Sequence, residues 1–481
     1  MHLRSWQSRC VNRALRAYRG GQRHFLSVAT PGAGKTVMAS ALANRLFKAD
    51  QIDLVICLTP SQVVKASFTR DLTDLTRLPM TGEIGSKGCV ITYQALGYLT
   101  QHFWQLFDHF RVFVIFDEIH HCGGAQDKPG NTWGEAIFTQ IHDRACYTLS
   151  LSGTPWRSDD LPVVFANYVR PDGRLKPDFV YSLREAIEDG VCRIPQIVVI
   201  DNNGIEVRRA EKGEHPPAVY GGIQQLFDEE ELPYQALLEN EQLLSHVLER
   251  SVEQLKHVQR TSPQAAGLII ASNVEHARTI HYRLVNDYAQ SATLVTHKTA
   301  NAAEQLLMFN MSNENWIVSV GMVSEGTNIP RLQVCCHLSR VKTELHFRQV
   351  LGRILRNTDS IYERAYMFVL ADVRLVQYAQ RIAEDLPGEA TIVSFESGPS
   401  MIEFGGSNQE PLLQQLLFDR QEEAMSVDQP VSVQWNESSN EHLVDGETEV
   451  LPPVQNERVS ISLFGQFMEE LIALQAEFRS S

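Results

Sequence analysis

The chain has 481 residues, 43% of them hydrophobic, and a formal net charge of −15. This length exceeds what one hydrophobic core usually organises, so we expect a globular protein of two or more domains. Its eight cysteines show no C-x-x-C spacing, and no apolar run approaches the ~20 residues of a membrane span, which favours a cytoplasmic protein and excludes a secreted or membrane-embedded one.

Short apolar runs alternate with longer helical patterns in the first third of the chain. The runs are rich in β-branched and aromatic residues and span residues 24–28, 54–58, 111–116 and 147–151. Such runs are typical of strands buried on both faces of a parallel sheet. We therefore expect residues 1–178 to form an α/β lobe whose sheet is covered by helices.

The same alternation returns in the second half of the chain. Apolar runs span residues 267–270, 294–296, 316–320, 334–338 and 366–370, so we assign residues 263–395 to a second α/β lobe. Residues 179–262 are expected to connect the two lobes. They include a helix that would pack on the lobes through one stripe of Leu244, Val247, Leu248, Val252, Leu255 and Val258.

The acidity is concentrated in an extension at residues 396–481. Residues 401–481 hold 15 acidic and three basic side chains, a net charge of −12, which leaves −3 for the first 400 residues. A nearly neutral body is compatible with a local basic groove for a polyanion. The extension has the composition of a poorly ordered segment. Near its end, a helical spacing of Phe464, Phe467, Met468, Leu471 and Leu474 predicts an amphipathic helix that docks on the body or on a protein partner.

A glycine-rich segment follows the first apolar run. Its residues are Ala29, Thr30, Pro31, Gly32, Ala33, Gly34, Lys35 and Thr36, and a helical stripe begins directly after them. Strand, glycine loop and helix in this order are the context of a P-loop, whose backbone N–H groups bind phosphate oxygens. We expect Lys35 to reach the β- and γ-phosphates of ATP and Thr36 to bind Mg²⁺.

Two carboxylates follow the third apolar run. Asp117 and Glu118 stand directly after residues 111–116, at the carboxyl end of a predicted parallel strand, where α/β sheets bind their ligands. Asp117 is suited to hold Mg²⁺, and Glu118 to orient and deprotonate an attacking water. The two segments together predict a site for Mg-ATP.

These motifs resemble those of superfamily two helicases of the DEAD/DEAH class, nearest to type III restriction motor subunits and related DNA-repair helicases. The resemblance covers about residues 3–372 and implies two tandem RecA-like P-loop lobes. In this family a leading Gln recognises adenine beside a basic residue, and Gln7 and Arg4 occupy these positions. The resemblance also implies nucleic-acid contacts or coupling roles for Pro60, Ser61, Thr92, Tyr93, His120, Ser152 and Thr154.

The resemblance continues in the second lobe. Ser272 and Asn273 correspond to a loop that contacts the nucleic-acid backbone, and Ser324, Gly326 and Asn328 to a motif that touches nucleic acid and nucleotide, where the family often has Asp in place of Asn328. The last motif contains Gln349, Gly352, Arg353 and Arg356. On a helix these four residues share one face, so both guanidinium groups could stabilise charge on a transferring phosphoryl group.

We therefore expect a nucleic-acid-stimulated ATPase that uses ATP and Mg²⁺ and closes its two lobes on the nucleotide. The preferred interpretation is a DNA helicase or translocase. Two alternatives stay open. One is an RNA helicase, and the other is an ATPase subunit that gates a partner nuclease or effector and docks through the acidic extension.

Overall fold

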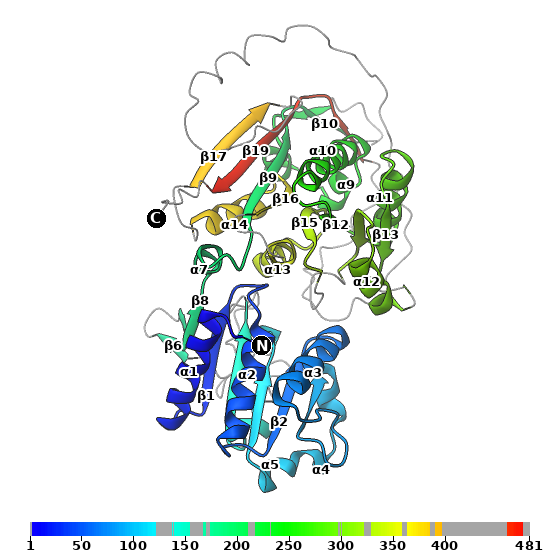
Figure 1. Cartoon of the computed structure of the whole chain (residues 1–481). Coiled ribbons are helices and arrows are strands. Elements are labelled where there is room, and N and C mark those ends of the chain that lie inside the picture. Colours follow the sequence, from blue (N-terminus) through cyan, green and yellow to red (C-terminus); the bar gives the residue numbers. More distant parts are fainter. Residues whose placement is uncertain are drawn as a thin grey trace. The chain divides into compact units, whose positions relative to one another are not determined.

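The protein is seen here as a computed structural model, which describes residues 2–121, 137, 139–153, 167–169, 174–209, 217–230, 232–296, 299, 301–321, 329–357, 363–384, 390–396 and 459–474 (Figure 1). The chain forms two compact units. One comprises Met1–Val199, Val247–Val393 and Leu471–Ser481, and the other Ile200–His246 and Ser394–Glu470. Both P-loop lobes expected from the sequence lie in the first unit. The connection expected at residues 179–262 is divided between the units.

Lobe 1 is built on a parallel sheet of six strands in the order β3-β2-β4-β5-β1-β8. The strands are β1 His24–Ala29, β2 Leu54–Thr59, β3 Gly88–Thr92, β4 Val112–Phe116, β5 Tyr147–Ser152 and β8 Phe179–Tyr181. All four strands expected from apolar runs in this lobe are confirmed. The short edge strand β8 falls in the segment that we had assigned to the connection.

Strand residues alternate between the two faces of this sheet, as the twofold period of a strand requires. Phe113 and Ile115 join a cluster with helices α1, α2 and α3, whereas Val112, Val114 and Phe116 pack on the opposite side. The helical elements of lobe 1 are α1 Ser5–Arg19, α2 Lys35–Lys48, α3 Gln62–Thr76, η1 Tyr93–Tyr98, α4 Gln101–Trp104, α5 Leu106–His109, η2 Ile119–His121 and α7 Leu183–Glu188. A small hairpin pairs β6 Asn167–Val169 with β7 Arg174–Lys176.

Lobe 2 is built on an eight-stranded sheet in the order β13-β14-β12-β15-β16-β9-β19-β17. The strands are β9 Ile194–Asn202, β12 Ala266–Ile270, β13 Ala292–Val295, β14 Trp316–Ser319, β15 Leu332–His337, β16 Arg364–Leu370, β17 Ala390–Glu396 and β19 Phe467–Leu474. The five strands expected here are confirmed, and the pairs among β12 to β16 are parallel. Strands β9 and β19 come from segments that we had placed outside the lobe.

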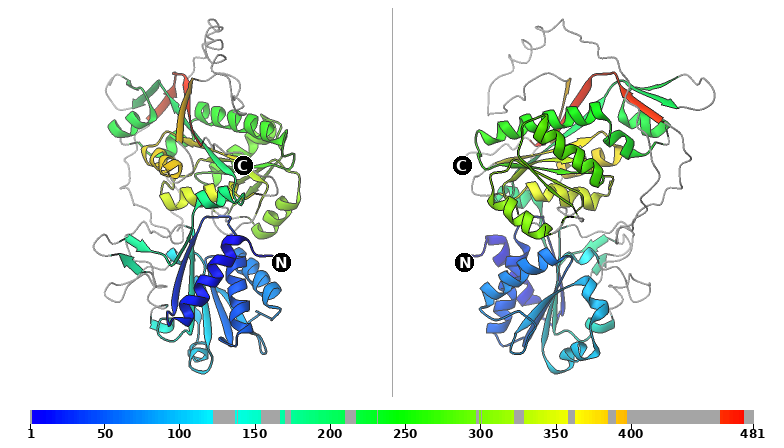
Figure 2. Two further views of the ribbon diagram at one scale, coloured as in Figure 1. Left: turned by 60° about the vertical axis from the view of Figure 1, so that its left-hand side comes forward. Right: turned by 90° about the vertical axis from the view of Figure 1, so that its right-hand side faces the viewer.

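The helices of lobe 2 include the packing helix predicted from its apolar stripe. This helix is α10, and the six residues of the stripe are all 0–5% exposed. The helices are α10 Glu241–Gln259, α11 Val274–Asn286, α12 Ala302–Met311, α13 Glu344–Ile354 and α14 Val373–Glu384, and further views of them are given in Figure 2. Helix α13 carries part of the arginine motif and packs against β15 and β16.

The second unit contains a small antiparallel sheet in the order β11-β10-β18. Its elements are β10 Ile205–Arg209, β11 Ala218–Tyr220, α8 Ile223–Glu229, α9 Tyr234–Leu238 and β18 Val459–Leu463. In the same unit the His246 ring stacks on Phe467, with centroids 4.0 Å apart, and its Nε2 lies 3.2 Å from Oε1 of buried Glu469.

The terminal helix expected from residues 464–474 is therefore wrong. Residues 467–474 form strand β19 instead, which lies between β9 and β17 in the sheet and pairs its backbone N–H and C=O groups there. Residues 397–458 and 475–481 of the acidic extension lie outside the described residues.

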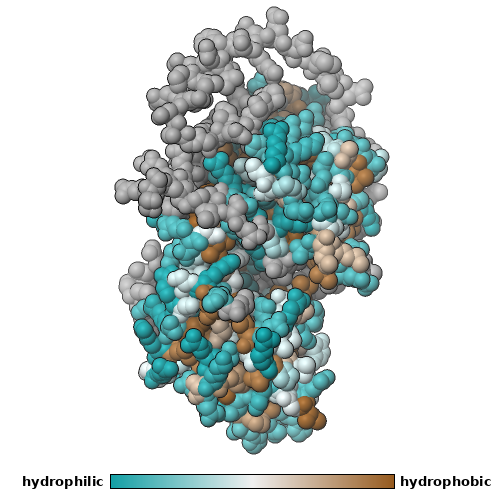
Figure 3. Space-filling model, in the orientation of Figure 1, coloured by the Kyte–Doolittle hydropathy of each residue, from teal (hydrophilic) through white to brown (hydrophobic). Residues whose placement is uncertain are grey.

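Within the described parts, none of the helices combines the length and the apolar character that crossing a membrane would require. The face of the molecule drawn in Figure 3 is mostly hydrophilic, with hydrophobic residues in small groups.

Candidate functional site

The P-loop joins the carboxyl end of β1 to the first residue of α2. Gly32 and Gly34 have φ angles of 82° and 95°, a left-handed conformation that glycine adopts without steric penalty. Gly34 is the N-cap residue of α2, so Lys35 and Thr36 lie in the first helical turn. The N–H of Thr30 donates to the carbonyl of Tyr181 at 3.0 Å, which ties the loop to β8. The strand, glycine loop and helix expected from the sequence are present, and anion binding by the loop stays a prediction.

Lys35 and Glu118 form an ion pair beneath this loop. Lys35 Nζ lies 3.1 Å from Glu118 Oε1, and the two side chains are 11% and 22% exposed. The other oxygen of Glu118 accepts the N–H of Gly153 at 3.3 Å. Burial acts to raise the pKa of the Glu118 carboxyl, but Lys35 and His120 together hold that pKa below its ordinary value. Glu118 is therefore a carboxylate, which is the form that a general base requires.

Glu118 also has a φ angle of 50°, which is uncommon for a residue with a side chain. Such a conformation costs on the order of 1–3 kcal/mol and persists only where the surroundings enforce it. Here the enforcing contacts are those to Lys35 and Gly153. The backbone at the end of β4 is bent so that this carboxylate faces the P-loop lysine.

Asp117 is buried at the end of β4, and its exposure is 7%. Its N–H donates to the carbonyl of Leu58 at 2.9 Å, and its carbonyl accepts the hydroxyl of Tyr93 at 2.8 Å. Tyr93 itself is fully buried. The Tyr93 hydroxyl thus supports the backbone of the acidic pair, and the contact of this strand-end loop with nucleic acid stays a prediction.

His120 links the acidic pair to the end of β5. Its Nδ1 lies 3.1 Å from the hydroxyl of Ser152 and 3.4 Å from Glu118 Oε2. His120 and Ser152 are both buried, with exposures of 2% and 0%. This contact brings together two motifs that the resemblance treats as separate, and the coupling role expected for Ser152 stays a prediction. Thr154, from the same motif, lies outside the described residues.

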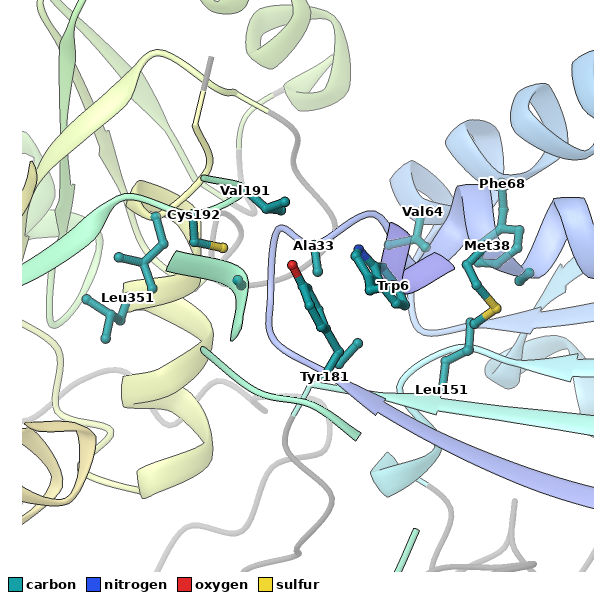
Figure 4. Packing of buried hydrophobic residues seen from close by; sticks show 14 of the residues in the cluster. Trp6, Ala33, Met38, Val64, Phe68, Leu151, Tyr181, Val191, Cys192 and Leu351 are labelled. Atoms are coloured by element: carbon teal, nitrogen blue, oxygen red, sulfur yellow. The ribbon is translucent and has the colours of Figure 1, made fainter. Parts of the chain in front are cut away.

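The start of α1 contacts the far side of the P-loop. The amide of Gln7 accepts the N–H of Arg4 at 2.8 Å and donates to the carbonyl of Gly34 at 3.0 Å, while Arg4 Nη1 donates to the carbonyl of Ala33 at 3.0 Å. Figure 4 shows Trp6 and Tyr181 near Ala33, and the two rings stack with centroids 4.7 Å apart. The aromatic pair was not predicted, although Trp6 adjoins Gln7 in the sequence.

The loops expected to bind the nucleic-acid backbone lie at strand ends, as predicted. In lobe 1 the half-buried Pro60 and Ser61 follow β2, Thr92 ends β3, and the hydroxyl of Ser61 accepts the N–H of Val64 at the start of α3. In lobe 2 the Asn273 side chain accepts the N–H of His276 at 2.8 Å. Both polar side chains therefore act as helix caps.

Ser272 also has a local partner. Its hydroxyl lies 2.9 Å from His276 Nδ1, and burial lowers the pKa of His276 to about 4. The neutral ring of His276 and the Ser272 hydroxyl thus form a buried pair at the carboxyl end of β12. The predicted contact of Ser272 with nucleic acid stays a prediction.

The arginine motif differs from the single helical face that we predicted. Gln349 and Arg353 are half-buried on α13, but this helix ends at Ile354. Arg356 lies beyond it, in an antiparallel bridge with Cys192, because the chain leaves the helix after the Leu355 cap. Burial and the charge of Arg353 lower the pKa of Arg356 to about 9. The two arginines are close enough to repel each other.

This arginine segment packs on the P-loop within the first unit. A Cβ added to Gly352 would lie 2.3 Å from Pro31 Cβ, and one added to Gly32 would lie 2.8 Å from Arg356 Cγ. Cys192 Sγ is 3.8 Å from the carbonyl of Pro31. The P-loop and the arginine segment can approach this closely only because Gly32 and Gly352 have no side chain. Gly326, Asn328 and Ser324, expected at the nucleotide or nucleic acid, lie outside the described residues.

The fold is that of a protein with two α/β lobes, the first of which carries a glycine-rich loop between β1 and α2. Residues 1–157 match the family described as type III restriction enzyme, res subunit. A type I restriction enzyme EcoAI endonuclease subunit from Escherichia coli is 22% identical over 295 residues, which are 59% of this chain and 34% of that protein. In these segments the chain is thus similar to subunits of restriction enzymes.

Two mycobacterial relatives match more of the chain. Uncharacterized proteins from Mycobacterium leprae (strain TN) and Mycobacterium tuberculosis (strain ATCC 25618 / H37Rv) are each 32% identical over 79% of this chain. The chain spans 64% and 63% of their respective lengths.

Two solved structures share the fold. An HsdR-subunit fragment of a type I restriction enzyme from Vibrio vulnificus YJ016 has a TM-score of 0.53 and 17% identity, covering 76% of this chain and 64% of that one. The ATP-dependent type ISP restriction-modification enzyme LlaBIII bound to DNA has a TM-score of 0.50 and 15% identity, covering 80% and 30%.

Proposed function

We propose that this protein is an ATP-dependent motor on nucleic acid, with DNA as its preferred track. The observation that carries the proposal is the meeting of three elements at one P-loop. Lys35 lies in the loop, Glu118 pairs with it at 3.1 Å, and the segment carrying Arg353 and Arg356 packs on Pro31 and Gly32. Phosphoryl transfer needs a loop that binds the phosphates, a general base, and cations that stabilise negative charge, and these three elements supply them.

The residues fit ATP and Mg²⁺ by their chemistry. The left-handed glycines of the P-loop leave its backbone open to phosphate oxygens, and Lys35 already lies beside an anionic oxygen, that of Glu118. Thr36 and Asp117 supply a hydroxyl and a carboxylate, the oxygen ligands that Mg²⁺ prefers. The metal would neutralise charge on the phosphates. Phosphate binding would draw Lys35 from Glu118, leaving that carboxylate to orient and deprotonate a water.

Hydrolysis would be coupled to movement through two contacts. Arg353 and Arg356 approach the P-loop from lobe 2. A nucleotide bound between the lobes would therefore favour closure of the lobes, and release of the products would favour their separation. In lobe 1 the chain Glu118–His120–Ser152 would transmit the state of the base to the end of β5. A strand held by loops of both lobes would then be moved stepwise.

DNA is preferred because the chain is similar to restriction-enzyme subunits, and one structure with this fold is described as bound to DNA. An RNA track is the alternative outcome of the test. We place the protein in the cytoplasm, where reduced thiols such as buried Cys335 and Cys336 persist. A protein partner at the acidic residues 397–458 stays a prediction.

The test is ATP hydrolysis by the purified chain with no polymer, single-stranded DNA, duplex DNA or RNA. Lys35→Ala should remove phosphate binding, and Glu118→Gln should keep binding but lose the base, so each should lower turnover by about 10²-fold or more. Stimulation by DNA that both variants abolish supports the proposal. Stimulation by RNA alone would move the track to RNA, and hydrolysis insensitive to both substitutions would contradict the proposed site.

A further inference from the structure

Arg193 is a buried arginine in the segment between the two lobes. Its side chain is 2% exposed and its Nε forms an ion pair with Glu363 at 2.7 Å. Its Nη1 lies within 3.0–3.1 Å of three backbone carbonyls, those of Pro330, Leu332 and Ile354. Its own N–H donates to the carbonyl of Leu355 at 2.7 Å. One residue thus holds two separate segments of lobe 2 together.

The two carbonyls at Ile354 and Leu355 belong to the end of α13. The last carbonyls of a helix have no partner within it, and a cation at this end interacts favourably with the helix dipole. Arg193 supplies both the donors and the charge. The next residue of the motif, Arg356, is bridged to Cys192, the neighbour of Arg193. The backbone from residue 354 to 356 is therefore fixed by Cys192 and Arg193.

The segment that contains Cys192 and Arg193 also reaches the P-loop. It leaves lobe 1 at Tyr181, whose carbonyl binds Thr30, and Cys192 then lies 3.8 Å from the carbonyl of Pro31. Figure 4 shows Cys192 and Val191 beside Leu351 of α13 and Ala33 of the P-loop. Arg193 is thus placed where the connection between the lobes meets both halves of the predicted phosphate site.

We propose that Arg193 is a positioning residue for the arginine motif. By closing the end of α13 and joining it to Pro330, it sets the direction in which Arg353 and Arg356 face the P-loop. This inference rests on the proposed function, because it gives those two arginines a task in ATP hydrolysis. Arg193 itself is separated from the phosphate site by the helix end and has no direct part in the chemistry.

The experiment compares Arg193→Met and Arg193→Lys with the intact full chain. Arg193→Met should lower kcat of DNA-stimulated hydrolysis at least about tenfold and change KM for ATP less than about threefold, because the P-loop is untouched. Lysine keeps the charge but lacks the planar set of donors, so Arg193→Lys should recover part of kcat. The double variant Arg193→Met with Glu363→Gln should stay slow, which excludes an unpaired buried carboxylate as the cause.

Arg331→Met is the matched control. Arg331 is also a buried arginine of lobe 2, 9% exposed. It lies between Pro330 and Leu332, whose carbonyls bind Arg193, but its own side chain donates to the carbonyl of Phe309 at 2.8 Å, so it tests the loss of a buried arginine from the same segment. It should lower the thermal midpoint about as much as Arg193→Met and leave kcat within about twofold of the parent. Equal losses of kcat in the two variants, or an unchanged kcat in Arg193→Met, would overturn the inference.

Hydrogen exchange of residues 349–357 separates this inference from the proposed function. Exchange should become at least about tenfold faster in Arg193→Met and stay unchanged in Arg331→Met, whether or not the parent hydrolyses ATP. If the parent shows no hydrolysis sensitive to Lys35→Ala, the proposed function fails. Unchanged exchange in Arg193→Met would then still decide against the positioning role, and faster exchange would support it.

Discussion

The two lobes share an architecture but assemble their functional residues in different ways. In lobe 1 each group of the site stands at the end of its own parallel strand, within a few residues of a recognisable motif. In lobe 2 the arginine motif depends on Arg193 and Cys192, which lie more than 150 positions away in the sequence. A site made of strand ends can be recognised locally, whereas a site held by a distant segment cannot.

The largest effect expected from this difference is at Gly352, where lobe 2 touches the P-loop. Helix propensity favours Ala over Gly by about 1 kcal/mol, so Gly352→Ala should strengthen α13 taken alone. In the protein its Cβ would clash with Pro31 at 2.3 Å, and the helix, with Arg353 on it, would be displaced from the P-loop. We expect ATP turnover to fall about 10²-fold.

Gly97→Ala is the control, because an added Cβ there meets no atom within 4 Å. Turnover at the parent level in Gly352→Ala, measured alongside an unchanged thermal midpoint, would show that the contact with the P-loop does not matter.

The next largest effect is a loss of stability of lobe 2 at acid pH. Burial and the neighbouring His346 lower the pKa of His337 to about 3, from an ordinary value of 6.5. As the pH falls below 6.5 the unfolded chain binds a proton that the folded chain does not, so stability is lost between pH 6.5 and 3. The loss from this residue is about 2 kcal/mol at pH 5.

The measurement is urea unfolding at pH 7 and pH 5, followed by exchange of the amides in β15. His337→Leu should flatten the pH dependence, whereas His102→Gln, at an exposed histidine, should not. If the stability of His337→Leu depends on pH in the same way as that of the parent, His337 is not the source of the acid effect.

A smaller effect tests the polar residues that cap helices. Asn273→Ala should destabilise lobe 2 by about 1 kcal/mol through loss of the cap on α11. Asn273→Ser should retain most of the stability that the cap provides. Both are compared by thermal unfolding and by binding to single-stranded DNA. If the two variants lose DNA affinity equally while Asn273→Ser keeps its stability, the amide itself contacts the nucleic acid and the cap is secondary.

The smallest effect is expected at Tyr93 in lobe 1. Tyr93→Phe removes one buried hydrogen bond to the carbonyl of Asp117 and should cost about 0.5–1 kcal/mol in thermal unfolding, with a modest loss of turnover. A loss of DNA affinity without a loss of stability would support a contact of Tyr93 with nucleic acid, as the sequence predicts.

The strands and the P-loop could be predicted because their signals are local. Buried parallel strands such as Val112–Phe116 are uninterrupted apolar runs, and the glycines of the P-loop stand directly between a strand and a helix. Lys35, Asp117 and Glu118 were found for the same reason. The contact between Lys35 and Glu118 follows from a general property of parallel sheets, whose carboxyl ends meet at one edge.

The remaining features depend on pairing across the chain. Arg193 is a charged residue before a strand, a position that is usually exposed, and nothing near it in the sequence indicates that it is buried. The helical spacing of residues 464–474 predicted a helix, yet tertiary pairing overrode this local pattern and formed β19. Arg356 left the predicted helical face because the same kind of non-local pairing, with Cys192, replaced the last helical turn.

Strand β19 has a consequence for synthesis of the protein. In the finished sheet β9 lies between β16 and β19, but 264 residues separate the end of β9 at Asn202 from the start of β19 at Phe467. At about 5–20 residues per second, a ribosome needs on the order of 10–50 s to bridge that interval. Both edges of β9 are unpaired until β16 has been made, and the edge that later pairs with β19 stays open to foreign strands for the whole interval.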